Sequence, residues 1–192
     1  MELNLPRPRE FDPEDALNSA MQVFWSKGYG ETSYDDLVKG TGVSRKGLYT
    51  VFGDKHQLFV ATLKNYRRTV IPALLERLGD DDIDIEGIRM TFQHLAEMAA
   101  SGAGHMGCFM ARTSADVSIH NEGVKEIIDL HWDDLNNRLL TALTNAGIPT
   151  ERSATLAPFY VGVMQGLFTL AHARADRAVI EPFVNEALRI LE

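Results

Sequence analysis

Apolar residues recur at every third or fourth position along most of this 192-residue chain, which is the spacing of amphipathic helices. The first predicted helix begins after Asp12 and ends at Gly28. Ser33 is expected to cap a second helix, and Ser44 a short third helix that ends before Gly53. The first part of the chain is therefore predicted to form three capped helices.

The rest of the chain shows the same helical spacing. Glycine and acidic clusters separate its apolar stripes, and no repeat or low-complexity segment interrupts them. The further predicted helices cover residues 55–78 with a kink at Pro72, 84–101, 108–117, 121–147, 150–173 and 181–192. The pattern indicates an all-α protein of about nine helices.

Residues 35–52, DDLVKGTGVSRKGLYTVF, have the pattern of a helix-turn-helix motif. Gly42 stands where a left-handed residue would end the first helix, and Val43 fills the turn. The second helix is short, basic and polar on its outer face, which suits the width of a DNA major groove. A helical hairpin with no DNA role has the same features, so the motif alone leaves both interpretations open.

The motif and its flanks carry three short patterns, G-Y-x-x-T-S, G-V-S-x-x-x-L-Y and F-x-x-K-x-x-L. They lie within residues 24–58, FWSKGYGETSYDDLVKGTGVSRKGLYTVFGDKHQL. In these patterns the chain resembles the TetR family of transcriptional regulators. Tyr34 and Lys39 depart from the pattern, because a small aliphatic residue and alanine are usual there. The resemblance implies an N-terminal three-helix helix-turn-helix DNA-binding domain, residues 1–54, and a helical effector-binding and dimerisation domain, residues 55–192.

DNA contacts are expected from the start and the outer face of the recognition helix, where side chains reach base edges and phosphates. Gly47 is expected on the groove-facing side, where it would allow close approach of the backbone. The resemblance implies phosphate contacts from Tyr49, from Thr32 or Ser33, and from Lys55, although Tyr49 as a core aromatic and Lys55 as a solvated lysine are open alternatives. The expected DNA-binding residues are Thr32, Ser33, Ser44, Arg45, Lys46, Gly47, Tyr49, Thr50 and Lys55.

The net charge of −8 is unevenly distributed along the chain. Residues 1–68 hold 10 Lys and Arg against 9 Asp and Glu, whereas residues 69–192 hold 9 against 18. DNA binding needs only a local group of basic residues near the phosphates. An N-terminal arm containing Arg7 and Arg9 could add to it by entering a minor groove. The alternative is that this arm is disordered, as chain termini usually are. The acidic excess of the second part also favours solubility.

Composition and motifs restrict the class of protein. A single cysteine excludes a disulfide within the chain. The sequence also contains no run of about 18 uncharged apolar residues, which is the length that a membrane span needs. A cytoplasmic protein with no membrane partner is expected. The sequence has no phosphate-binding glycine loop, nucleophile elbow or H-E-x-x-H motif, so no catalytic residue, cofactor or metal site is expected. His131 and Asp134 are three residues apart, a spacing that helices produce by chance.

The last two predicted helices indicate a homodimer. The eighth is apolar nearly all round, so it must be covered on several sides, and the ninth carries one apolar stripe. Two such helices from each subunit would form a four-helix interface that matches a two-fold operator, although burial within one subunit is the alternative. The expected interface residues are Gly162, Gly166, Ile180, Phe183, Val184, Ala187, Leu188 and Leu191.

The resemblance implies a repressor released from a palindromic operator when a small molecule enters the second domain. As a set, bulky or polar side chains there favour an apolar or aromatic effector, although for each one alone plain core packing is the favoured interpretation. The candidates are Phe92, His94, Met98, Cys108, Phe109, Met110, His131, Trp132, Tyr160, Met164 and Phe168. The alternative is a redox or electrophile sensor, because a helix N-terminus at Cys108 would favour the thiolate. A small buried structural cysteine is the favoured interpretation of this position.

Overall fold

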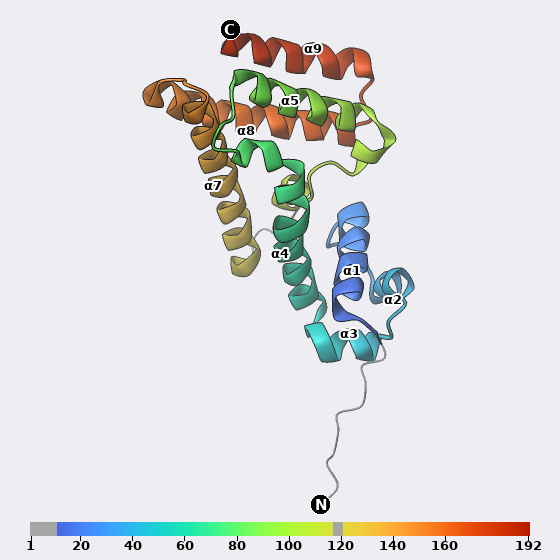
Figure 1. Ribbon diagram of the computed structural model, residues 1–192. Coiled ribbons are helices and arrows are strands. Elements are labelled where there is room, and N and C mark those ends of the chain that lie inside the picture. The colour runs from blue at the N-terminus through green and yellow to red at the C-terminus, as the bar shows by residue number, and fades with distance from the viewer. Residues whose placement is uncertain (1–10, 117–120) are drawn as a thin grey trace, which may run out of the picture. The chain divides into compact units, whose positions relative to one another are not determined.

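A computed structural model describes residues 11–116 and 121–192, and these residues form helices and no strand (Figure 1). Arg7 and Arg9 of the expected arm lie outside the described residues. Two compact units divide the chain, Met1–Asn65 and Tyr66–Glu192. The α-helices are α1 Pro13–Lys27, α2 Tyr34–Thr41, α3 Arg45–Phe52, α4 Lys55–Leu74, α5 Ile85–Ala100, α6 Phe109–Ser114, α7 Glu122–Asn145, α8 Thr150–His172 and α9 Arg177–Leu188. Three short 3₁₀ helices complete them, η1 Glu76–Gly79, η2 Gly102–Met106 and η4 Arg189–Leu191.

Unit 1 is held together by an aromatic and aliphatic core. Phe24 of α1 and Phe59 of α4 are buried and meet edge to face, with their ring centroids 5.1 Å apart. Leu37 and Leu48 bring α2 and α3 onto the same core. Local signals set the helix starts, as at Asp54, whose carboxylate accepts a hydrogen bond from an N–H in the first turn of α4 at 2.8 Å.

Unit 2 is built around α8. This helix contacts α5, α7 and α9, and nine of its residues are buried (Figure 1). Among the described residues, α8 is the one helix long and apolar enough to cross a membrane by length and composition. Because other helices of the same unit cover it, that composition is the one expected of a core helix.

Two of the predicted helix boundaries that are wrong involve proline. α4 ends at Leu74, two residues after Pro72, and the chain continues as the 3₁₀ helix η1 rather than as α-helix to residue 78. α9 starts at Arg177, four residues before the predicted position, so Pro182 lies inside it. Proline has no N–H to donate to the carbonyl one turn earlier in a helix. Because Pro182 is exposed, water can bond to that carbonyl instead.

Candidate functional site

Local hydrogen bonds set the starts of α2 and α3, and a glycine ends α2. The Ser33 hydroxyl accepts a hydrogen bond from the Asp36 N–H at 3.1 Å, and the Asp36 carboxylate accepts one from the Ser33 N–H at 2.9 Å. Gly42 ends α2 with a φ of +70°, in the left-handed region that favours glycine. The Ser44 hydroxyl then caps α3 by accepting from the Gly47 N–H at 3.1 Å. The caps predicted for this motif are confirmed.

One face of α3 is exposed and polar. Arg45, Lys46, Tyr49 and Thr50 lie on it, whereas Leu48 is buried. The Thr50 hydroxyl donates to the Lys46 carbonyl at 2.8 Å, and its oxygen can still accept a hydrogen bond. A helix of eight residues with such a face can enter a DNA major groove.

Tyr34, the first residue of α2, joins this face from the neighbouring helix. Its ring stacks on the ring of Tyr49, with centroids 5.3 Å apart and 15° between the planes. The guanidinium carbon of Arg45 lies 4.1 Å from the Tyr34 centroid and 5.9 Å from the Tyr49 centroid. The sequence marked Tyr34 only as a departure from a family pattern. A large ring at a position usually held by a small residue was the feature of the sequence that could have indicated a role for Tyr34 on this face.

Two predicted DNA contacts need correction. Thr32 is buried, and its hydroxyl donates to the Gly28 carbonyl at 2.6 Å, so this hydroxyl is not offered to a phosphate. Gly47 does not face a groove, because a Cβ there would lie 2.8 Å from a Val43 methyl and 3.2 Å from the Phe11 ring. Glycine is needed at position 47 for packing inside unit 1. Of the Thr32 and Ser33 alternatives, Ser33 is the exposed residue, although its hydroxyl also donates within the protein, to the Asp36 carboxylate at 2.8 Å.

Two lysines of unit 1 are held in different ways. Lys27 of α1 pairs with Asp36 of α2, and this ion pair, with the Ser33 hydrogen bonds, holds the pKa of the Asp36 carboxyl well below its usual range. Lys55, at the start of α4, has its ammonium nitrogen 4.5 Å from the ring centroid of Tyr29. The Asp36 carboxylate compensates the charge of Lys27, whereas the contact of Lys55 with Tyr29 is with an aromatic face.

The predicted effector residues are mostly core residues of unit 2. The Tyr160 hydroxyl donates to the Ala187 carbonyl at 3.0 Å, and the Tyr160 ring packs 5.0 Å from that of Phe92. Burial and these contacts identify most of the set as packing residues. Buried members are Phe92, Cys108, Phe109, Met110, His131, Tyr160, Met164 and Phe168, half-buried ones are Met98 and Trp132, and His94 is exposed.

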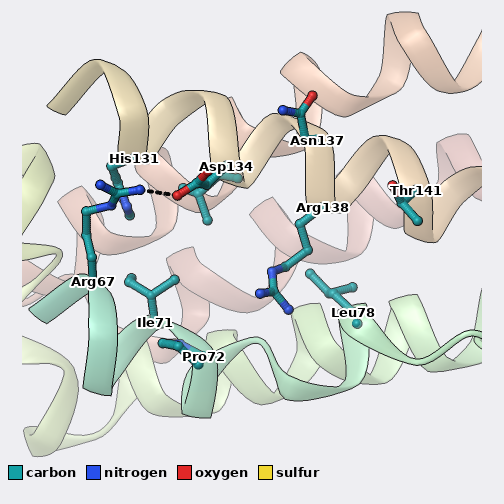
Figure 2. A pocket seen from close by; sticks show the side chains of 11 residues that line it. Arg67, Ile71, Pro72, Leu78, His131, Asp134, Asn137, Arg138 and Thr141 are labelled. Carbon is teal, nitrogen blue, oxygen red and sulfur yellow. Dashed lines mark hydrogen bonds and ion pairs between the residues drawn. The ribbon is translucent and has the colours of Figure 1, made fainter. Parts of the chain in front are cut away.

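A groove of about 540 Å³ lies between the C-terminal half of α4, η1 and α7 (Figure 2). Its lining residues are Arg67, Ile71, Pro72, Leu78, Gly79, His131, Asp134, Leu135, Asn137, Arg138 and Thr141. His131 is the one predicted effector residue among them. Sequence reasoning missed the two arginines because it searched for aromatic and methionine side chains. The spacing of positions 131, 134, 138 and 141 on one helix face was the available signal.

Comparison with known proteins agrees with both units. The family model described as "Bacterial regulatory proteins, tetR family" matches residues 16–62, and the one described as "Transcriptional regulator LmrA/YxaF-like, C-terminal domain" matches residues 85–186. The chain belongs to the TetR family. It is 31% identical over 188 residues to the transcriptional repressor BdcR of Escherichia coli K12, a match that covers 96% of this chain and 93% of BdcR.

Other TetR-family relatives cover nearly the whole chain. The transcriptional repressor ComR of E. coli K12 is 27% identical over 190 residues, covering 96% of this chain and 90% of ComR. The solved structure of a CifR cysteine mutant, complexed with 26-bp operator DNA, superposes with a TM-score of 0.82 at 26% identity. That match covers 95% of this chain and 98% of CifR.

The thiol of Cys108 is enclosed in this TetR-family chain. Its side chain is buried, and the Tyr66 hydroxyl donates to its sulfur at 3.8 Å. Burial raises the pKa of the Cys108 thiol, whereas the sequence predicted that the N-terminus of α6 would favour the thiolate. Desolvation outweighs the hydrogen bonds from the short helix α6, so the structure agrees with the buried cysteine that the sequence favoured and not with the thiolate of a sensor.

The residues predicted for a dimer interface fall into two groups. Ile180, Val184, Ala187 and Leu188 are buried within the chain itself, so their side chains are already covered. Gly166 packs against its own α9, since a Cβ there would lie 2.9 Å from the Phe183 ring. Gly162 is exposed, Phe183 is 36% exposed and Leu191 is half-buried. The exposed apolar residues Phe159 and Ile190, on α8 and η4, join Phe183 around an open groove of about 740 Å³.

Proposed function

We propose that this chain is a cytoplasmic transcriptional repressor that binds a palindromic operator as a homodimer and releases it when a small molecule binds unit 2. The observation that carries the proposal is the exposed face of α3, on which Arg45 is held by two tyrosines. The relatives BdcR and ComR, described as transcriptional repressors, support the direction of regulation. Residues 1–54 are the proposed DNA-binding domain, and residues 55–192 the effector and dimerisation domain.

Arg45 and Lys46 are proposed to reach base edges, because they lie at the N-terminal end of α3, which enters the groove first. Ser33, Tyr49 and Lys55 are proposed to contact phosphates. The exposure of Tyr49 and the position of Lys55 at the start of α4 support this role, and the Ser33 hydroxyl, which donates to the Asp36 carboxylate at 2.8 Å, would have to exchange that hydrogen bond. Phosphate contacts fix the position on DNA, and base contacts carry the sequence preference.

The dimer is proposed to form through the apolar groove of α8 and α9 that is lined by Phe159, Phe183 and Ile190. Exposed aromatic and aliphatic side chains around an open groove support this assignment. A two-fold dimer places two recognition helices on half-sites about one turn of DNA apart. Release of DNA then requires a ligand that binds more tightly to the conformation that does not fit the operator.

The test is operator binding by the full-length protein. A duplex would first be selected from a random library, and affinity would then be measured by fluorescence anisotropy for wild type and for the Arg45→Ala/Tyr49→Phe double variant. The double variant should bind at least about tenfold more weakly, with unchanged thermal unfolding. Arg152→Ala, which removes an exposed arginine of unit 2, should leave affinity unchanged. Operator binding by the double variant at wild-type strength would contradict the assignment of α3.

A further inference from the structure

The groove between α4 and α7 combines an apolar floor with cationic walls. Ile71, Leu78 and Leu135 supply aliphatic surface. Arg67 on α4 and Arg138 on α7 extend into the space between the two facing helices (Figure 2). A site with one apolar part and a few convergent polar groups is typical of small-molecule recognition.

His131 adds a buried polar atom to the lining of the groove. Its side chain is 1% exposed, and its Nε2 atom finds no hydrogen-bond partner within the part of the chain that the structure describes. An unsatisfied buried nitrogen costs free energy unless something else bonds to it. Burial, with the positive charge of Arg67, lowers the pKa of His131 to about 4, so the ring is neutral near pH 7 and its Nε2 can exchange a hydrogen bond with a ligand.

The charge of the groove is opposite to that of its surroundings. Residues 66–192 hold 11 Lys and Arg against 18 Asp and Glu, yet the groove contains two arginines and a single acid, Asp134. The Arg138 guanidinium donates to the neutral Leu75 carbonyl at 3.3 Å, so no carboxylate neutralises it in the described ion pairs. Arg67 pairs with Asp134, whose side chain is 64% exposed and is therefore free to give way. An anion would be repelled by most of unit 2 and attracted here.

We propose that this groove binds an amphipathic monoanion, a carboxylate or sulfonate with an apolar body. The anionic group lies within reach of Arg138 and Arg67, where charge-assisted and bidentate hydrogen bonds are strong. The body lies on Ile71, Leu78 and Leu135, and one polar atom meets His131. That this anion is also the effector rests on the proposed function. It replaces the apolar effector expected from the sequence with a charged one.

The test compares two dyes that share a ring system and differ in charge. The probe 8-anilino-1-naphthalenesulfonate carries one negative charge, and N-phenyl-1-naphthylamine is its neutral counterpart. Fluorescence titration of the full-length protein should give saturable binding that is at least about tenfold tighter for the sulfonate. In Arg138→Met that preference should fall about tenfold while binding of the neutral dye is unchanged, which also shows that the groove is folded.

Two further variants complete the design. Arg138→Lys should retain part of the preference, because it keeps the charge and loses the bidentate geometry. Arg89→Met, which removes an arginine of α5 outside the groove, should behave as wild type. Equal affinity for both dyes, no saturable sulfonate binding, or a preference that survives Arg138→Met would overturn the proposal. Since no DNA is present, failure of this test leaves the operator proposal standing, and failure of operator binding leaves this one standing.

Discussion

Tyr34 is expected to raise operator affinity by holding Arg45 in place before DNA arrives. The Arg45 guanidinium lies 4.1 Å from the Tyr34 centroid. Such a contact at an exposed site contributes about 0.5–1 kcal/mol, and fixing a long side chain in the complex costs a similar amount when it is free beforehand. A dimer has two such sites, so Tyr34→Ala should cost about 1–3 kcal/mol, which is a loss in affinity of about 5-fold to 160-fold.

The assay is fluorescence anisotropy on the selected operator, with a double-mutant cycle as its control. Tyr34→Phe keeps the ring and should bind within about twofold of wild type. In an Arg45→Ala background, Tyr34→Ala should have almost no further effect, because the residue it positions is gone. Losses that simply add in the double variant would refute the reasoning and would assign Tyr34 to a separate contact or to the stability of unit 1.

Three further predictions concern unit 2. Urea unfolding at fixed protein concentration should show that wild type loses about 2 kcal/mol more than His131→Gln between about pH 7 and pH 5. The unfolded imidazole gains a proton below 6.5 that the folded one excludes down to about 4. Equal losses in wild type and His131→Gln would contradict the argument. Cys108 should react with a thiol reagent at least about a hundredfold more slowly in the folded protein than in urea, and reaction at the unfolded rate would show that the thiol is accessible. Phe159→Glu should yield monomers by sedimentation velocity while Met90→Glu, at a comparably exposed site on α5, stays dimeric, and a dimeric Phe159→Glu would place the interface elsewhere.

The helices that the sequence predicted well are those with a chemical signal at their ends. Ser33 and Ser44 accept hydrogen bonds from the first turns of α2 and α3, and Gly42 takes a conformation that other residues avoid. Such signals act over three or four residues, so they can be read locally. Pro182 misled the prediction because proline is compatible both with a helix start and with an exposed interior position whose carbonyl reaches water.

The candidate site was less predictable because its residues meet only through tertiary packing. Phe92 and Tyr160 have the helical spacing of a cavity lining, but core packing produces the same spacing, and the structure buries them against each other. Arg67 and Arg138 lie on helices far apart in the sequence, and nothing local shows that those helices face one another. Gly47 illustrates the same limit, since its need for glycine comes from Val43 and Phe11 rather than from a DNA groove.

The partner of each cation separates the structural cations of this protein from those available to a ligand. Lys27 is paired with Asp36, so its charge is compensated and its role is to hold α1 to α2. Arg45 lies against tyrosine rings, a contact that orients a cation and leaves its charge in place. Because the affinity of a protein for DNA depends on uncompensated charge at the phosphates, aromatic partners suit the cations of a DNA-binding surface better than carboxylates do. The same reasoning applies to Arg138 of unit 2. Its guanidinium donates to a neutral carbonyl, so its positive charge remains available to an anion.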